Sequence, residues 1–214
     1  MKFAIISDTH CLHRKLILPD SDVLIHCGDF TSRGKMTETI NFLNWFEDCA
    51  AKYKILISGN HEFWDEQYPD KMLKECSTRG ITYLNDSGST VGGLKMWGSP
   101  ITPFFNNFAF NRLRGAAIKV HWDLIPSETQ ILITHGPPWG IGDIVKERYG
   151  VKRVGCKDLA NKITELKDLK LHCFGHIHSG QGKYTDNING VTYINASQLD
   201  EEYKIAYAPM EFEC

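Results

Sequence analysis

Short, continuous apolar runs that each end in a cluster of polar residues are the feature that most constrains the fold of this chain. Five such runs occupy residues 2–7, 22–27, 53–58, 130–134 and 169–174. Their short length and β-branched content favour strands over helices, and their lack of alternation indicates strands that are covered on both faces. A sheet covered on both faces needs helices or a second sheet as neighbours, so the runs predict a layered α/β protein.

Helical patterns lie between these runs. Apolar residues recur at helical spacing across residues 36–52 and again across 159–166, and residues 69–79 and 111–123 are two further predicted helices. Later strands, antiparallel or at sheet edges, are expected at 81–84, 89–97, 191–196 and 205–212. The order is β-α-β first and β-rich later, which predicts an α/β sandwich of two sheets flanked by helices.

The domain organisation follows from what is missing between the runs. No internal repeat, low-complexity tract or Pro/Gly-rich linker divides the sequence, so residues 1–214 are expected to form a single domain with a substantial core. The formal net charge of −2 predicts no broad attraction to nucleic acid or to an anionic membrane surface. No apolar stretch reaches the roughly 20 residues that span a bilayer, so no membrane segment is expected.

The expected compartment rests on the cysteines and on the first residues. Seven cysteines without a C-x-x-C pattern favour free thiols over a disulfide framework or a Cys-based zinc site. Residues 1–8 predict a buried strand rather than a signal peptide, because the apolar run is short and the acidic Asp8 follows it at once. Both observations favour a cytoplasmic protein.

The polar clusters supply an unusual set of side chains. Because the carboxyl ends of parallel strands meet at one edge of a sheet, we expect clusters at these ends to converge on one crevice. Together they contain two aspartates, one asparagine and several histidines, which are ligands that Mn²⁺, Fe²⁺ and Zn²⁺ accept. A pair of such cations about 3.5–4 Å apart is a common device for in-line displacement at phosphorus. The clusters are Asp8-Thr9-His10, Gly28-Asp29, Gly59-Asn60-His61, Thr134-His135-Gly136 and Gly175-His176-Ile177-His178.

These blocks resemble the calcineurin-like metallophosphoesterase superfamily, whose pattern is D-x-H, G-D, G-N-H, H-G and G-H-x-H. The metallophosphoesterase-domain-containing branch is the most similar, and the resemblance extends from residue 3 to about residue 197. It implies a calcineurin-like four-layer α/β/β/α sandwich of two mixed sheets flanked by helices. Some mammalian members of that branch are similar but carry glycine in place of His176, whereas this chain keeps the imidazole, which implies a competent dinuclear centre.

The resemblance also implies a role for each residue of the pattern. Two divalent metal ions, most simply Mn²⁺ with Fe or Zn²⁺ as alternatives, would be held with Asp29 as the bridging ligand, and a metal-bridging hydroxide would attack phosphorus. His61 would be the general acid for the leaving oxygen, and Asp8 and Asn60 would assist catalysis as well as bind metal. The implied metal ligands are Asp8, His10 and His178 for one ion, Asn60, His135 and His176 for the other, and Asp29 for both.

Other polar and aromatic residues have less specific patterns. Glu62 is expected to be a solvated or helix-starting carboxylate, and the histidines at 26, 121 and 172 are expected to be structural. His13 is left open between a structural role and a place facing the substrate. Aromatic residues crowd positions 97–110, where they would either stack a substrate ring or simply cover the sheet. The charged segment 139–153 is expected to be a solvated loop, or to steer a phosphate, and Arg33 is a similar case.

Two classes of function remain open. The first is a metal-dependent phosphoesterase, for which the resemblance implies a small phosphodiester substrate such as a cyclic nucleotide. A phosphomonoesterase or protein phosphatase is the weaker enzymatic alternative. The second class is a catalytically weak scaffold that uses the same fold to bind proteins. The presence of His61 together with all seven predicted ligands favours chemistry over the scaffold.

Overall fold

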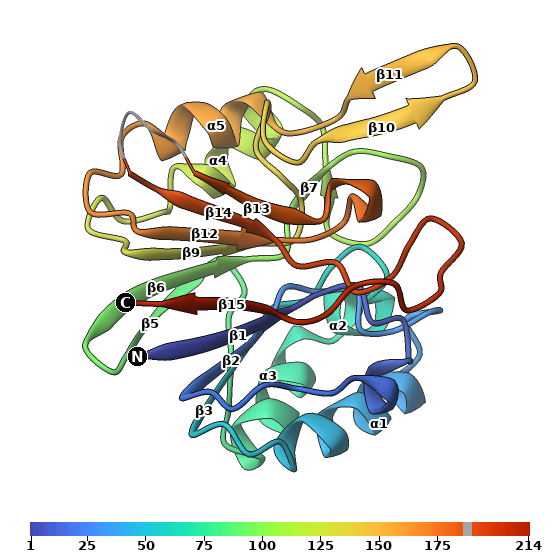
Figure 1. The fold of residues 1–214 in the computed structure, drawn as a ribbon, viewed down its shortest axis with the longest axis vertical. Coiled ribbons are helices and arrows are strands. Elements are labelled where there is room, and N and C mark those ends of the chain that lie inside the picture. The colour runs from blue at the N-terminus through green and yellow to red at the C-terminus, as the bar shows by residue number, and fades with distance from the viewer. Residues whose placement is uncertain (186–189) are drawn as a thin grey trace.

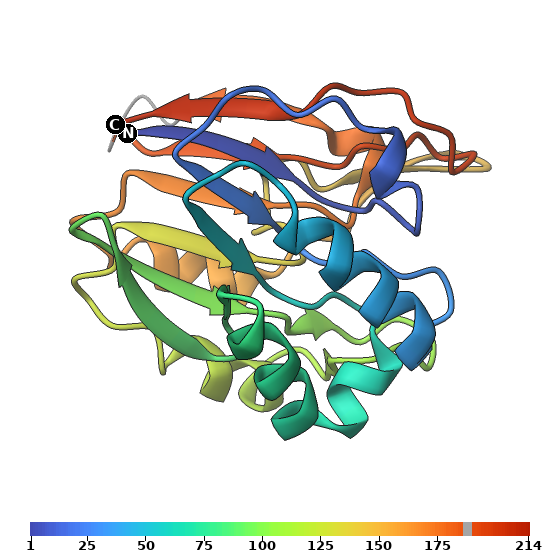
Figure 2. The same cartoon turned by 90° about the horizontal axis from the view of Figure 1, so that it is seen from below.

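The structure is a computed structural model that describes residues 1–185 and 190–214. Two β-sheets lie face to face, with helices on the outer face of each, as Figure 1 and the perpendicular view in Figure 2 show. This is the four-layer α/β/β/α sandwich of two mixed sheets that the resemblance implied.

The first sheet has the strand order β15-β1-β2-β3-β4. Four of its strands are parallel, and β15 pairs antiparallel with β1 at the edge. Helices α1 (Met36–Glu47) and α3 (Pro69–Thr78) cover its outer face, and the short α2 (Phe63–Gln67) leads into α3. The strands are β1 (Lys2–Ile6), β2 (Val23–His26), β3 (Tyr53–Leu56), β4 (Ile81–Tyr83) and β15 (Met210–Glu213).

The second sheet has the order β13-β14-β12-β9-β6-β5, with four parallel strands in the middle and an antiparallel strand at each edge. Helices α4 (Ala116–Trp122) and α5 (Lys157–Ile163) pack on its outer face. The strands are β5 (Ser87–Val91), β6 (Leu94–Ser99), β9 (Ile131–Thr134), β12 (Leu171–Phe174), β13 (Gly182–Thr185) and β14 (Thr192–Asn195).

The continuous apolar runs are explained by burial on both faces. In β1, Phe3 and Ile5 point into the core between the two sheets, while Ala4 and Ile6 point toward the α1/α3 layer. Successive side chains of a strand alternate between faces, so a strand that lies between two apolar layers must be apolar at every position. The same alternation in β9 places Leu132 against the α4/α5 layer.

Several predicted element bounds were wrong. The segment predicted as one strand at 89–97 is a hairpin of β5 and β6, because Gly92 and Gly93 both have positive φ and form the tight turn between them. The final strand begins only after Pro209, which has no N–H to donate to a strand ladder. The predicted helix at 111–123 is shorter, because residues 111–112 form strand β8 (Asn111–Arg112) beside β7 (Thr102–Pro103).

The charged segment that was expected to be a loop contains a β-hairpin of β10 (Ile144–Glu147) and β11 (Gly150–Arg153). It extends away from the second sheet in Figure 1. No helix within residues 1–185 and 190–214 has the length and apolar character needed to cross a membrane. All seven cysteines are free thiols, as predicted.

Candidate metal centre

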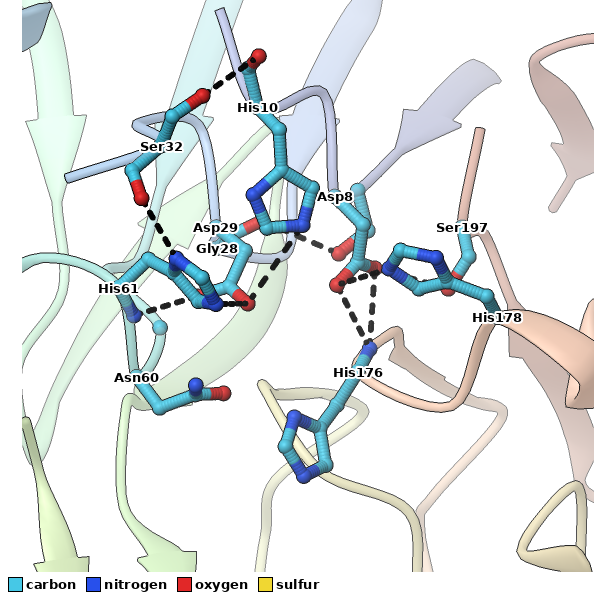
Figure 3. Close-up of polar contacts among 12 residues, drawn as sticks. Asp8, His10, Gly28, Asp29, Ser32, Asn60, His61, His176, His178 and Ser197 are labelled. Atoms are coloured by element: carbon cyan, nitrogen blue, oxygen red, sulfur yellow. Dashed lines mark hydrogen bonds and ion pairs between the residues drawn. The ribbon is translucent and has the colours of Figure 1, made fainter. Parts of the chain in front are cut away.

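The five polar clusters converge in a crevice between the two sheets. The ends of β1, β2 and β3 supply Asp8, His10, Asp29 and Asn60 from the first sheet. The ends of β9 and β12 supply His135, His176 and His178 from the second sheet. Figure 3 shows the side chains from both sheets facing a common centre. Three overlapping groups have their ligand atoms within 4.8 Å of one another, namely Asp8/His10/His178, His10/Asp29/His61 and Asp29/His135/His176.

A backbone carbonyl fixes the tautomer of four of these imidazoles. In each, Nδ1 lies within hydrogen-bond distance of a carbonyl oxygen, which can only accept, so Nδ1 must carry the proton. The unprotonated Nε2 of the neutral ring then faces the crevice as a metal ligand requires. The pairs are His10 with Thr31 O (3.0 Å), His61 with Ser32 O (3.0 Å), His135 with Cys27 O (2.8 Å) and His178 with Asp200 O (2.8 Å).

Asp29 is the centre of the arrangement. Its Oδ2 lies 3.2 Å from His135 Nε2 and 3.9 Å from the Nε2 atoms of both His10 and His61. Its Oδ1 accepts a hydrogen bond from the backbone N–H of His61 (2.8 Å), which fixes the carboxylate plane. One oxygen of Asp29 therefore lies among imidazoles that come from both sheets.

A cation fits the site because its acceptor atoms would otherwise repel one another. His135 Nε2 lies 2.9 Å from Asn60 Oδ1 and 3.2 Å from Asp29 Oδ2, yet its Nδ1 already holds the proton of the neutral ring. Three acceptors so close together need a proton or a cation among them. His10 Nε2 is also buried without a hydrogen-bond partner among the described residues. The donor set and its geometry therefore fit divalent cations.

The pKa values reflect the same crowding. Burial alone would lower the pKa of His135, but the Asp29 carboxylate outweighs it and raises that pKa to about 9. Burial opposes the charge of His178 too, and its contact with Asp8 raises the pKa to about 9. Burial acts to raise the pKa values of the Asp8 and Asp29 carboxyls, and the neighbouring imidazoles hold both well below the usual range. Both carboxylates are thus available as ligands at neutral pH.

Asp8 is held by the loop after β12. The backbone N–H of His176 donates to both Asp8 oxygens (3.0 and 2.9 Å), and the Ser197 hydroxyl donates to Oδ2 (2.8 Å). Gly175 allows this approach, because a Cβ at that position would lie 2.1 Å from Asp8 Oδ2. The contacts join β1 of the first sheet to β12 of the second.

Backbone strain is concentrated among the predicted ligands. Four of the seven, Asp8, His10, Asp29 and His176, have positive φ, between 38° and 68°. Non-glycine residues adopt this region at a cost of about 1–3 kcal/mol each, so the surrounding contacts must enforce it. Such strain is typical of functional sites.

Glu62 was expected to be a solvated or helix-starting carboxylate. It is the N-cap residue of α2, which confirms the second alternative, and the first was wrong. Its carboxylate is fully buried, and four donors surround it. Oε2 accepts from the backbone N–H groups of Asp29 (2.8 Å) and Gly59 (2.6 Å), and Oε1 accepts from the N–H and hydroxyl of Thr31 (both 2.9 Å). Burial and the Asp29 charge raise its pKa to about 7, while the Thr31 and Gly59 amides oppose this. Glu62 therefore ties the loop after β2 to the loop after β3.

A cavity of about 1080 Å³ opens above the predicted ligands. Phe104, Phe105 and Phe108 form one part of its lining, and Trp139 with the β10–β11 hairpin forms another. Tyr203 also lines it, although no sequence pattern had indicated this residue. The ring of Phe108 lies 5.1 Å from that of His61. Part of the aromatic segment 97–110 thus faces the site, whereas Trp97 and Phe110 belong to the core.

The histidines expected to be structural do not line this cavity. His26 and His172 are buried inside strands, and His121 pairs with Asp86 at 2.7 Å. The contacts of His13 favour the structural role over a place facing the substrate. It is buried, lies 3.2 Å from Asn41 Oδ1 and packs against the rings of Phe42 and Trp45.

The fold and the clustered imidazoles and carboxylates define a metallophosphoesterase-type protein. The sequence model of the calcineurin-like phosphoesterase family matches residues 1–180, and the chain belongs to this family. Its His/Asp clusters are consistent with the dinuclear metal site that is typical of the family.

Individual relatives agree with this assignment. The metallophosphoesterase domain-containing protein 1 of Homo sapiens is 36% identical over 230 residues, which cover 98% of this chain and 69% of that protein. The Mus musculus protein of the same name matches to the same extent. The crystal structure of TT1561 of Thermus thermophilus has a TM-score of 0.59 at 11% identity and covers 91% of this chain and 88% of that chain, which supports the fold alone.

Proposed function

We propose that this protein is a metal-dependent phosphodiesterase that hydrolyses small phosphodiesters, such as cyclic nucleotides, in the cytoplasm. The observation that carries the proposal is the cluster of imidazole Nε2 atoms and carboxylate oxygens on the floor of an open cavity. Backbone carbonyls orient four of the imidazole rings. Two divalent cations, most simply Mn²⁺, would be held by Asp8, His10 and His178, by Asn60, His135 and His176, and by Asp29 between them. When bound, they supply Lewis acidity and an acidified water.

The chain's own residues supply orientation and a proton. Ser32 O holds the His61 ring through Nδ1, and this leaves Nε2 facing the centre near Asp29. In its protonated form, His61 can deliver the Nε2 proton to the leaving oxygen while the Ser32 contact is kept. Two neighbouring side chains help to orient the other imidazoles. Asn60 Oδ1 contacts His135, and Asp8 Oδ1 contacts His178.

The shape of the cavity supports a diester over a monoester. A phosphate monoester has one organic substituent, whereas a diester has two that must both be accommodated. The cavity has about 1080 Å³ of space, with apolar and aromatic side chains on more than one side. This lining suits two organic groups, of which at least one is planar.

The test is hydrolysis of bis-p-nitrophenyl phosphate and p-nitrophenyl phosphate with Mn²⁺, and again after chelation. We expect metal-dependent turnover that is faster for the diester. A rate with metal no higher than that of the chelated protein would favour the scaffold instead. Screening 2′,3′- and 3′,5′-cyclic nucleotides would then define the natural class.

The role of His61 makes a specific prediction. His61→Ala should slow diester turnover by about 10²- to 10⁴-fold, because a positioned acid contributes that much. Metal content, measured by elemental analysis, should stay at the wild-type level. His121→Ala is the matched control, since His121 does not line the cavity. Loss of bound metal in His61→Ala would show that this imidazole is a ligand and not the acid.

A further inference from the structure

A tight turn near the C-terminus places a tyrosine at the cavity. Residues 199–205 form a loop closed by the bridge between Leu199 and Ile205. Inside it, Asp200 Oδ1 accepts hydrogen bonds from the backbone N–H groups of Glu202 and Lys204 (both 2.9 Å), and the N–H of Tyr203 donates to Asp200 O (3.0 Å). The same carbonyl is the partner of His178 Nδ1. This turn therefore orients a predicted metal ligand and Tyr203 together.

Tyr203 has a strained backbone. Its φ is +60°, a region that a bulky side chain rarely occupies. The hydrogen bonds of the turn enforce this conformation, at a cost of about 1–3 kcal/mol. A glycine would form the same turn without this strain. The contacts of the tyrosine side chain therefore have to explain why a bulky residue is placed here.

The side chain lies against the metal centre. Its ring is 4.9 Å from that of His10 and 5.3 Å from that of His178, edge-on to both. The residue is half-exposed and lines the cavity. Its hydroxyl forms no hydrogen bond within residues 1–185 and 190–214, whereas the hydroxyls of Tyr83 and Tyr184 are both bonded. An unused donor therefore stands beside the predicted ligands.

The basic residues of the cavity do not supply such a donor there. Arg153 pairs with Asp143 (2.6 Å) and Lys152 with Glu147 (3.5 Å). Two further basic side chains of the lining, those of Arg114 and Lys157, are held by other groups. Arg114 donates to the carbonyls of Gly155 and Val154, and Lys157 lies over the ring of Trp139. A phosphodiester anion bound at the metal centre would need donors for its oxygens, and Tyr203 is placed to be one.

We propose that Tyr203 is a catalytic residue that donates its phenolic hydrogen to a non-bridging oxygen of the bound phosphoryl group. The proposal deepens the phosphodiesterase assignment and rests on it. The phenol stays neutral, and its hydrogen bond stabilises charge on the phosphoryl group during displacement. Tyr203 lies beyond residues 1–180, which the family model matches.

The test is Tyr203→Phe, which removes the hydroxyl and keeps the ring against His10 and His178. We expect kcat/KM for bis-p-nitrophenyl phosphate to fall by about 10- to 100-fold, with metal content unchanged. Inorganic phosphate, titrated into the Mn²⁺-loaded protein in a calorimeter, should bind about tenfold more weakly or worse. The matched control is Tyr149→Phe, which removes the hydroxyl of an exposed tyrosine in the β10–β11 turn, outside the cavity.

The outcomes separate this proposal from the proposed function. If the wild-type protein hydrolyses diesters and Tyr203→Phe matches it in both kcat/KM and phosphate affinity, the role of Tyr203 is refuted and the phosphodiesterase stands. If the wild type is inactive on diesters, the phosphate titration still tests the hydrogen bond. A visible charge-transfer band in the Fe³⁺-loaded wild type that is lost in Tyr203→Phe would make the phenol a metal ligand, and would overturn the proposal.

Discussion

Single backbone carbonyls decide the chemistry of the imidazoles in this site. Each accepts the Nδ1 proton of one ring and so selects a single tautomer, in which Nε2 of the neutral ring carries no proton. Three of the four carbonyls lie on strand-end loops that also carry predicted site residues, because Cys27 precedes Asp29 by two positions and Thr31 and Ser32 follow it closely. Ligand and orienting partner are therefore built by the same short segments.

Glu62 makes a prediction at this scale. Glu62→Gln would place an amide –NH₂ opposite at least one backbone N–H, whichever way the side chain turns, because both carboxylate oxygens accept from backbone N–H groups. The loops that carry Asp29 and Asn60 would then separate. We expect metal affinity, measured by calorimetry, to fall by about 10- to 100-fold, the usual cost of losing an orienting partner.

Glu38→Gln is the matched control for this change. Glu38 also accepts backbone hydrogen bonds, from Arg33 (2.9 Å) and Lys35 (3.2 Å), but it is only partly buried, at the start of α1. It should bind metal like the wild type. If Glu62→Gln lowered the melting temperature but left metal affinity intact, its carboxylate would be a structural tie and not an orienting residue.

The sequence predicted site residues that lie in short recognisable blocks. It did not predict the environment of residues whose neighbours come from distant parts of the chain. The D-x-H, G-D, G-N-H, H-G and G-H-x-H blocks contain all the residues of the three His/Asp groups found in the described part of the chain. The solvated alternative for Glu62 was wrong because two of the three residues that donate to its carboxylate lie 31 and 33 positions away on another loop. Tyr203 was missed because its place depends on how the chain returns along the first sheet toward β15.

At the scale of elements, the site depends on how closely two strand-end loops approach. The loop after β12 reaches Asp8 after β1 across the boundary between the sheets, and Gly175 leaves the necessary space. The neighbouring Gly136, after β9, is less constrained, since a Cβ there would meet nothing closer than Thr102 Cγ2 at 3.4 Å. An added methyl group should therefore fit at Gly136 but not at Gly175.

Gly175→Ala should displace Asp8 and lower metal affinity by at least about tenfold. Its added methyl group would lie 2.1 Å from both Asp8 Oδ2 and Ser7 Oγ, so one of the loops must move. Overpacking of this kind also costs about 1–3 kcal/mol of unfolding free energy. Gly136→Ala should bind metal and melt like the wild type. Equal metal affinity in the two variants would mean that the approach of the loops is not what holds Asp8.

The elements themselves were predictable where burial dictates composition. Strands between two apolar layers have unbroken apolar sequences, and β1, β2, β3, β9 and β12 were found in this way. The β10–β11 hairpin was not, because its exposed strands carry charges on both faces and resemble a loop. Its pairing follows from backbone hydrogen bonding around the turn at Arg148–Tyr149 and not from any hydrophobic pattern.

At the scale of the whole molecule, three apolar layers carry the stability, and His172 is buried at one of them in β12. The Thr134 hydroxyl donates to Gly136 O, so it accepts from His172 Nε2, and Nδ1 is left without a proton or a partner among the described residues. Burial lowers the pKa of this ring to about 3, compared with 6.5 for a free histidine. It stays neutral in the folded protein.

This burial predicts a pH dependence of stability. The unfolded chain takes up a proton at His172 below about pH 6.5, while the folded protein does so only near pH 3. The contribution of the neutral His172 ring to the free energy of unfolding is therefore complete above pH 6.5. It is lost as the pH falls below that value, by about 1.4 kcal/mol per pH unit. His172→Gln keeps a donor for Thr134 without titrating. Urea unfolding between pH 7 and 5, with chelator present, should show a shallower acid loss in the variant; parallel curves would contradict it.

The cavity has a further consequence, because its floor and its walls come from different parts of the chain. The floor is made by strand ends that the interior of the sandwich fixes, whereas the walls are surface additions, namely the phenylalanine loop, the β10–β11 hairpin and the turn that carries Tyr203. Exchange of the phenylalanine loop or the hairpin would therefore leave the predicted metal-binding residues in place, whereas the turn also holds His178 through Asp200 O. We expect related chains to diverge in which alcohol they release while they keep the same cation-binding residues beneath it.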